Sequence, residues 1–156
     1  MNIVVVSDTH GVQRNIKKVL PYIRKADMFI HAGDHFRDSV NISRETSVPC
    51  MGVVGNCDFD NSEPELFFEV EGLKIFLTHG HSYGVKYGLD GLVTKAQELG
   101  ADIVIFGHTH TKLDETVNGI RIINPGSLSL PRDSHNGTFV LMCVENGSCA
   151  VSFREV

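Results

Sequence analysis

Histidine and aspartate recur in five short clusters, and these residues are the ones in this sequence best able to do chemistry. The chain has eight histidines among 156 residues, and imidazole is both the commonest metal ligand and the usual acid–base group near neutral pH. The clusters are Asp8-Thr9-His10, Gly33-Asp34, Gly55-Asn56-Cys57-Asp58, His79-Gly80-His81 and Gly107-His108-Thr109-His110. Carboxylate and imidazole donors without paired thiolates favour Mn, Fe, Zn or Ni over a soft metal.

Each cluster follows an apolar run that predicts a β-strand. The runs cover residues 2–7, 26–31, 48–54, 73–78 and 102–106. The first is rich in β-branched residues, as in a strand that is buried on both faces. Sites in open α/β sheets form outside the carboxyl ends of the strands, so we expect all five clusters to meet at one edge. One cluster alone is typical of an ordinary turn, but five in this order predict a metal site.

The elements that must position these clusters alternate between strands and helices. Apolar residues fall at helical spacing over residues 12–23 and again over 89–99, where Gly100 is typical of a helix end. The segment between the second and third strands is expected to be a loop. Two further pairs of strands are expected around Asn118-Gly119 and Asn146-Gly147, a strong hairpin signal. With no linker or repeat, the pattern predicts one α/β domain over residues 1–156 with an all-β carboxy-terminal part.

Composition excludes several classes of protein. Hydrophobic residues make up 42% and charged residues 21% of the chain, so a disordered chain is excluded. The net charge of -5 argues against a basic surface for duplex nucleic acid. No apolar run has the length of a membrane span or a signal sequence, so we expect no membrane partner and a cytoplasmic location.

The four cysteines show no C-x-x-C spacing and are expected to be free thiols in a reducing compartment. Cys50, Cys143 and Cys149 are expected to be small buried apolar residues. Cys57 is treated separately because it lies inside one of the five clusters.

The five clusters resemble the motifs of the calcineurin-like metallophosphoesterase superfamily, in its small single-domain branch of bacterial and archaeal phosphodiesterases. The resemblance spans residues 8–110, and Asn124-Pro125-Gly126-Ser127 is similar to the segment that follows the last metal motif. It implies a four-layer α/β/β/α sandwich, in which helices flank two mixed β-sheets, with two divalent metal ions at one edge. It also implies hydrolysis of small phosphodiesters by a metal-bridging hydroxide. Mn²⁺ is the expected metal, with Ni, Fe, Zn or Mg as alternatives.

The resemblance divides the ligands between two metals. One metal would be held by Asp8, His10, Asp34 and His110, and the other by Asp34, Asn56, His79 and His108. Asp34 would therefore bridge, and a bridging carboxylate brings two cations to about 3.5–4 Å, the spacing of two-metal phosphoryl chemistry. The residues expected to take part in catalysis are Asp34, Asn56, His10 and Cys57.

Cys57 departs from the wider family, in which a histidine at this position is taken to protonate the leaving group. A thiol, with a reference pKa near 8.5, is a poorer acid. We therefore expect weak activity on monoesters and a preference for leaving groups that need little protonation. Two other functions stay open: a phosphomonoesterase or phosphoprotein phosphatase, and a non-catalytic scaffold module of the same fold.

The remaining histidines receive separate expectations. His31 is expected to be a buried, hydrogen-bonded support, and His135 to be exposed to solvent. His35 is expected at the rim of the site, either in contact with substrate or in a solvated loop. His81 resembles a family position whose backbone contributes to the metal site, and direct ligation by its imidazole is the alternative.

The sequence leaves two interpretations open for each of three charged residues and for the oligomeric state. Asp58 either orients its loop or caps a turn. Arg37 and Arg132 either bind a substrate phosphate or are ordinary surface residues. A homodimer is an open option, since a small domain with many β-edges gains from covering them.

Overall fold

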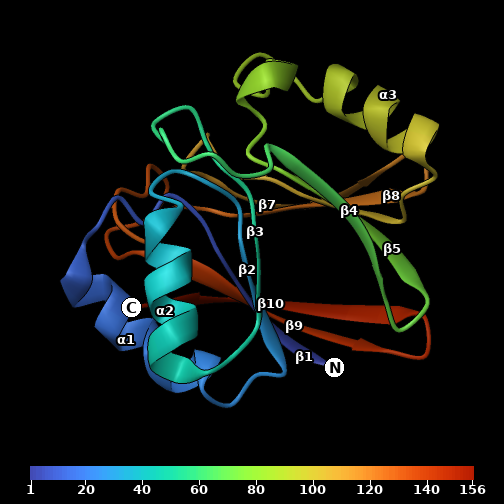
Figure 1. The fold of residues 1–156 in the computed structure, drawn as a ribbon. Coiled ribbons are helices and arrows are strands. Elements are labelled where there is room, and N and C mark those ends of the chain that lie inside the picture. The colour runs from blue at the N-terminus through green and yellow to red at the C-terminus, as the bar shows by residue number, and fades with distance from the viewer.

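The computed structural model describes residues 1–156 and contains two five-stranded β-sheets packed face to face (Figure 1). Sheet A has the strand order β10-β9-β1-β2-β3, and sheet B has the order β4-β5-β6-β8-β7. Sheet A consists of β1 (Asn2–Val6), β2 (Met28–His31), β3 (Cys50–Gly52), β9 (Thr138–Glu145) and β10 (Ser148–Glu155). Sheet B consists of β4 (Glu65–Val70), β5 (Leu73–Thr78), β6 (Ile103–Ile105), β7 (Lys112–Val117) and β8 (Ile120–Pro125).

Both sheets are mixed. Strands β1, β2 and β3 are parallel, while β9 pairs antiparallel with both β1 and β10. In sheet B, β5, β6 and β8 are parallel, and β4 and β7 add antiparallel edges. The parallel strands of each sheet deliver their carboxyl ends to the same edge of the molecule.

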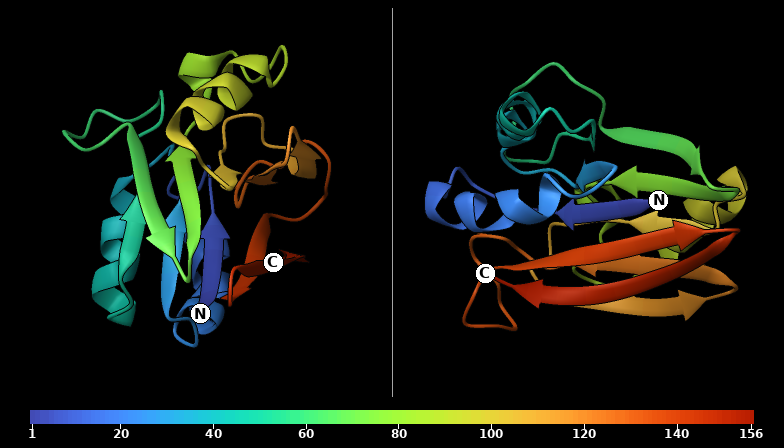
Figure 2. Two further views of the ribbon diagram at one scale, coloured as in Figure 1. Left: turned by 90° about the vertical axis from the view of Figure 1, so that its right-hand side faces the viewer. Right: turned by 90° about the horizontal axis from the view of Figure 1, so that it is seen from below.

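Helices form the two outer layers. Helices α1 (Gln13–Ile23) and α2 (Arg37–Thr46) pack on sheet A, and α3 (Asp90–Leu99) packs on sheet B. In both views of Figure 2, α1 and α2, blue to cyan, lie well apart from α3, yellow. The expected four-layer α/β/β/α sandwich is confirmed. None of these helices has both the length and the apolar character that a membrane crossing requires.

The first strand shows how the sequence specifies this layering. Ile3 and Val5 belong to the apolar core between the two sheets, whereas Val4 and Val6 belong to the core between sheet A and its helices. Because successive side chains of a strand point to opposite faces, an unbroken β-branched run fills both cores at once. All four residues are buried.

The segment after β2 is a helix and not the expected loop. Helix α2 has only one buried apolar residue, Ile42, and it buries the polar Asp38 and Ser39 beside it. The apolar periodicity that predicts a helix is therefore almost absent from this segment. The helix ends at Ser47, which adopts a left-handed backbone conformation (φ 60°) and precedes Val48-Pro49.

The expected hairpins are present, and one strand is shorter than expected. Asn118-Gly119 joins β7 to β8 and Asn146-Gly147 joins β9 to β10, with positive φ at all four residues as this turn requires. The run over residues 48–54 forms only the short strand β3, which begins just after Pro49, a residue without an amide donor.

The expectation of three buried cysteines was wrong. Cys143 is exposed, and Cys50 and Cys149 are only partly buried. Burial alternates along β9, and Cys143 lies on the outer face of sheet A, at a part that no helix covers. All four cysteines are free thiols, as expected.

Candidate metal centre

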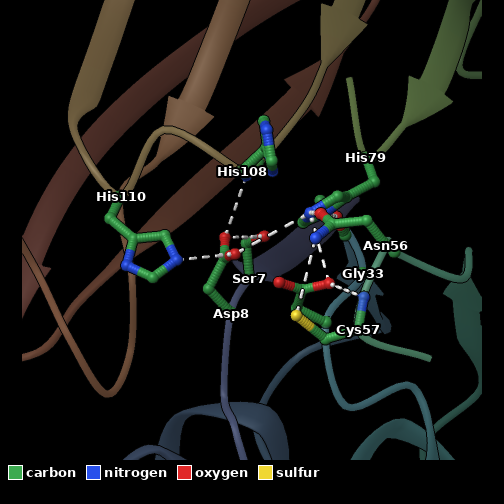
Figure 3. A network of polar contacts seen from close by, with 12 residues as sticks. Ser7, Asp8, Gly33, Asn56, Cys57, His79, His108 and His110 are labelled. Carbon is green, nitrogen blue, oxygen red and sulfur yellow. Dashed lines mark hydrogen bonds and ion pairs between the residues drawn. The ribbon is translucent and has the colours of Figure 1, made fainter. Parts of the chain in front are cut away.

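Five strand ends bring the predicted site residues together at one edge (Figure 3). Sheet A contributes Asp8 and His10 after β1, Asp34 after β2, and Asn56 and Cys57 after β3. Sheet B contributes His79 after β5, and His108 and His110 after β6. Backbone hydrogen bonds tie these loops together, from the Asp8 amide to the Gly33 carbonyl (3.0 Å) and from the Gly107 amide to the His79 carbonyl (3.2 Å).

His110 faces Asp8 with a lone pair. Nδ1 of His110 lies 2.8 Å from the Leu130 carbonyl oxygen, which can only accept, so Nδ1 carries the proton. Nε2 of the neutral ring is then an acceptor, yet it lies 3.0 Å from Oδ1 of Asp8. Two acceptors at this distance repel each other unless a proton or a cation lies between them. In the metal-free protein, this contact raises the pKa of His110.

His79 repeats the arrangement on the other side of the site. Its Nδ1 donates to the Ala32 carbonyl (2.7 Å), so Nε2 offers a lone pair. That atom lies 3.1 Å from Oδ1 of Asn56 and 3.3 Å from Oδ1 of Asp34, both of which are acceptors. A histidine held through one nitrogen by a carbonyl, with the other free, is the usual arrangement of a metal ligand.

Asp34 lies between the two groups of side chains. Its Oδ1 faces His79, whereas its Oδ2 lies 3.8 Å from Nε2 of His10. The Cys57 amide donates to Oδ1 (3.0 Å) and fixes the carboxylate. The close approach depends on Gly55, because a Cβ atom there would lie 2.2 Å from Oδ1 of Asp34.

The donor set fits a divalent cation. The ligand atoms of Asp8, His10, Asp34 and His110 all lie within 4.8 Å of one another. Oδ1 of Asp8 and Nε2 of His10 are buried and make no hydrogen bond, although buried polar atoms are almost always paired in native proteins. Unpaired oxygen and nitrogen donors that converge on one point suit Mn, Fe, Zn or Ni.

The charge states also suit ligation. Burial on its own would raise the pKa of Asp8, but its close contact with His110 and the proximity of His79 lower it overall in the metal-free protein. Burial is the main cause that lowers the pKa of His108 to about 4. At neutral pH the site therefore presents an ionised carboxylate and a neutral imidazole at these two positions.

Several site residues adopt a left-handed backbone conformation. The φ angles of Asp8, His10, Asp34, His108 and His110 lie between 44° and 68°. This region is uncommon for residues other than glycine, and such conformations cluster at functional sites. The surrounding hydrogen bonds hold the turns in place, and each turn aims its side chain into the site.

A group of serine and asparagine side chains supports the candidate ligands, and the sequence points to only two of its four members. Ser7 donates to Oδ2 of Asp8 (2.6 Å), which leaves Oδ1 directed into the site. Ser127 and Ser129 both donate to the Asp8 carbonyl, at 2.9 Å and 2.7 Å. Asn124 donates to the Gly107 carbonyl (2.9 Å). Among these, the resemblance to the family points to Asn124 and Ser127, and no sequence signal indicates Ser7 or Ser129.

A buried relay joins the first two loops. The Gly33 amide donates to Nδ1 of His31 (3.2 Å), so the proton of His31 is on Nε2, which donates to Oγ1 of Thr9 (3.0 Å). Thr9 in turn donates to Oδ2 of Asp38 (2.6 Å), which also accepts from the Gly11 amide (3.0 Å). His31 is thus the buried, hydrogen-bonded support that the sequence predicts. Asp38 was missed because the helix that carries it was missed.

His31 is expected to make the metal-free protein less stable in mild acid. Burial lowers the pKa of His31 from 6.5 to about 4. Between these values the unfolded chain binds a proton that the folded chain does not, so stability falls as the pH drops from about 6.5 to 4. The expected contribution is roughly 1 kcal/mol per pH unit. Urea unfolding across this range, with chelator present, measures it.

The matched variants for this prediction are His31→Gln and His135→Gln. His31→Gln is expected to be less stable at pH 7 but to lose less stability on acidification. His135 is exposed, so His135→Gln is expected to keep the wild-type slope. Equal slopes in all three proteins would contradict a neutral, buried His31.

The other predicted histidines lie at the rim of the site or away from it. His35 is half exposed, with its Nδ1 3.0 Å from Oδ2 of Asp38. The exposed ring of His81 lies 5.5 Å from the His79 ring and 6.1 Å from the His108 ring, measured between centroids. His135 is exposed in its loop, as expected.

The charged candidates take structural positions around the site. Both carboxylate oxygens of Asp58 accept backbone protons, from Gly55 (2.7 Å) and Phe36 (2.8 Å), so Asp58 both caps its turn and orients the loop. Arg37 pairs with Asp60 at 3.2 Å. Arg132 is exposed, and its amide donates to the His110 carbonyl (2.9 Å).

Comparisons with known proteins agree with this geometry. Residues 1–147 match the family described as the calcineurin-like phosphoesterase superfamily domain. The probable metallophosphoesterase YsnB of Bacillus subtilis is 35% identical to this chain, over 99% of this chain and 91% of YsnB. The phosphodiesterase MJ0936 of Methanocaldococcus jannaschii is 29% identical, over 81% of this chain and 83% of that protein.

Solved structures show the same fold. A predicted phosphoesterase from Streptococcus pneumoniae superposes with a TM-score of 0.85 at 29% identity, covering 99% of this chain and 88% of that chain. Vps29 of Entamoeba histolytica, 21% identical, shares the fold with a TM-score of 0.80 over 100% of this chain and 99% of that chain. On the family match and these relatives, the chain is a metal-dependent phosphoesterase and belongs to the calcineurin-like phosphoesterase superfamily.

Proposed function

We propose that this protein is a two-metal phosphodiesterase that hydrolyses small phosphodiesters. The arrangement of Asp34 carries the proposal, since its two oxygens face different sets of imidazole nitrogens. Asp8, His10, Asp34 and His110 would hold one cation, and Asp34, Asn56, His79 and His108 the other. When bound, the two cations supply Lewis-acid chemistry: they activate a water and stabilise the charge that develops on the phosphoryl oxygens.

The residues of the chain hold and orient these groups. The Ala32 and Leu130 carbonyls fix the protons of His79 and His110 on Nδ1, so each ring turns a lone pair toward the site. Asn56 supplies a neutral oxygen, which limits the negative charge that the site gathers before substrate binds. The substrate phosphate brings negative charge of its own, so a lower charge on the ligands favours its approach.

Mn²⁺ is the proposed metal, and Ni, Fe, Zn and Mg are alternatives, because oxygen and imidazole donors accept all of these ions. We also propose a cytoplasmic location and no duplex nucleic acid or membrane partner, in keeping with the net charge of -5. Strand β10 ends sheet A with one unpaired edge, which a homodimer would cover.

The test of the proposed function compares a diester with a monoester that has the same leaving group. Bis(4-nitrophenyl) phosphate and 4-nitrophenyl phosphate are assayed with Mn²⁺, and kcat/KM is expected to be higher for the diester. A higher value for the monoester would favour the phosphomonoesterase. No turnover of either, with metal bound, would favour a non-catalytic module of the same fold.

Changing Cys57 to histidine is expected to raise activity on alkyl monoesters selectively. Partial desolvation of the largely exposed Cys57 thiol raises its pKa, and so do its contact with Asp34 and the negative charges of Asp34 and Asp58, which makes the thiol a poorer acid still. An alkoxide leaving group needs a proton, for which general acid catalysis is worth about 10²–10⁴-fold, whereas nitrophenolate does not. Cys57 is exposed, so an imidazole has room there.

The measurement is kcat/KM for an alkyl monoester and for a nitrophenyl diester, at matched metal occupancy. Cys57→Ser serves as the control, because it changes the side chain at position 57 without introducing a better acid. Equal changes on both substrates in Cys57→His would show that position 57 acts through the geometry of the site and not as an acid.

A further inference from the structure

A hollow of about 490 Å³ lies beside the metal centre and has no role in the function proposed so far. Its lining includes His35, Arg37, Cys57, Phe59 and Asn61. The Cys57 amide is bonded to Oδ1 of Asp34, so the hollow begins next to the central carboxylate of the site. The loop that carries most of its lining follows β3 and projects at the upper left of Figure 1.

Phe59 is the unusual residue of this hollow. Its relative exposure is 101%, so its ring makes almost no packing contact with the rest of the chain. Transfer of a phenylalanine side chain out of water stabilises a protein by about 1.5–3 kcal/mol, and this residue contributes none of that to the fold. An apolar ring left free at the mouth of a polar site is suited to covering a ligand.

The loop under Phe59 is held on both sides. Asp58, the residue before it, accepts from the Gly55 and Phe36 amides, and Asp60, the residue after it, pairs with Arg37. The contacts of Asp58 with Phe36 and of Asp60 with Arg37 join the loop to the start of α2, which begins at Arg37, three residues after Asp34. The ring of Phe59 is therefore carried by a fixed backbone at a fixed side of the metal centre.

We propose that this hollow binds a flat aromatic ring on one ester substituent of the substrate, a nucleobase or an aryl group, stacked on Phe59. The proposal rests on the proposed phosphodiesterase function, because the metal centre would hold the phosphate of the same molecule. Stacking tolerates any ring with a π-face. The half-exposed His35, which makes no hydrogen bond through Nε2, lies on the wall of the same hollow.

The test uses tryptophan as a reporter, because the chain has none. Phe59→Trp places the only tryptophan of the variant at the proposed stacking position. Thymidine 5′-monophosphate, phenyl phosphate and methyl phosphate are each titrated with Mn²⁺ present. Saturable quenching is expected with thymidine 5′-monophosphate or phenyl phosphate and not with ringless methyl phosphate. Comparing the two ring compounds tells whether a nucleobase or an aryl group is the better occupant.

The matched control is Tyr87→Trp, because Tyr87 is equally exposed (95%) and does not line the hollow. Its fluorescence is expected to stay constant in all three titrations. A second measurement is inhibition of diester hydrolysis. Phe59→Ala is expected to raise the inhibition constant of thymidine 5′-monophosphate or phenyl phosphate by about 5-fold or more. The same variant is expected to leave the inhibition constant of methyl phosphate unchanged, because methyl phosphate has no ring to stack.

The outcomes separate this inference from the proposed function. The stacking site is overturned if neither ring compound quenches the fluorescence of Phe59→Trp. It is also overturned if methyl phosphate quenches that fluorescence as strongly as the ring compounds do. Both conclusions hold even if diesters are hydrolysed normally. Absence of hydrolysis overturns the phosphodiesterase, while the fluorescence titration still tests the hollow. Unchanged inhibition constants for both ring compounds in Phe59→Ala also overturn the inference.

Discussion

Removal of divalent metal is expected to reduce hydrolysis of a nitrophenyl diester to the uncatalysed rate, and restoring Mn²⁺ is expected to recover it. The site is built from acceptors that face one another, such as Nε2 of His110 and Oδ1 of Asp8 at 3.0 Å. In the neutral rings of His79 and His110, the single N–H proton is on Nδ1 and is donated to a backbone carbonyl. Neither ring therefore has another proton to donate to a substrate. Without cations, this arrangement has no means of stabilising charge on a phosphoryl group.

The measurement combines dialysis against chelator, elemental analysis and the diester assay. Protein treated with chelator and then resupplied with excess Mn²⁺ is the control for damage during stripping. Full turnover by protein that elemental analysis shows to be metal-free would contradict the proposed mechanism.

The change Asp34→Asn is expected to cost more activity than any other single substitution of a ligand. Even loss of a partner that only supports a metal ligand costs about 10–100-fold in affinity or activity. Asp34 faces both halves of the site through its two oxygens, so we expect a loss of more than about 100-fold. The neutral amide keeps the shape of the side chain and removes its charge from both halves together.

His110→Ala is the matched comparison, because His110 lies on the side of Asp8 and His10 only. Asp34→Asn is expected to bind fewer than two equivalents of Mn²⁺ with weakened affinity for both. His110→Ala is expected to retain one equivalent. Metal stoichiometry by equilibrium dialysis decides the matter, and two equivalents bound to Asp34→Asn at wild-type affinity would rule out a bridging Asp34.

The clusters could be read from the sequence because each follows an apolar run of predictable length. Val4 and Val6 alternate with Ile3 and Val5 to fill two cores. The end of this apolar run therefore marks the end of the strand. The carboxyl ends of β1 and β2 lie together because these strands pair in parallel in sheet A, and those of β5 and β6 lie together for the same reason in sheet B. The four-layer order itself came from the resemblance to the family, and the structure confirms it.

Other features depend on contacts that no local pattern encodes. Helix α2 packs through Ile42 with the polar Asp38 and Ser39 beside it, so its segment lacks an apolar stripe. Asp38 is buried where groups from two loops converge on it, Thr9 and Gly11 after β1 and His35 after β2, and only the assembled fold reveals this. The exposure of Phe59 is equally invisible in the sequence, where a phenylalanine is ordinarily expected in the core.

The left-handed turns at Asp8, His10, Asp34, His108 and His110 have a consequence for how such a chain can change over generations. Conformations of this kind cost of order 1–3 kcal/mol each when they are truly strained, and the facing acceptors add electrostatic repulsion in the metal-free state. A lineage released from the need for hydrolysis would gain stability by replacing these residues one at a time, with glycine or asparagine at the turns. None of these turn residues belongs to an apolar core, so such replacements would leave the two sheets and their three apolar cores intact.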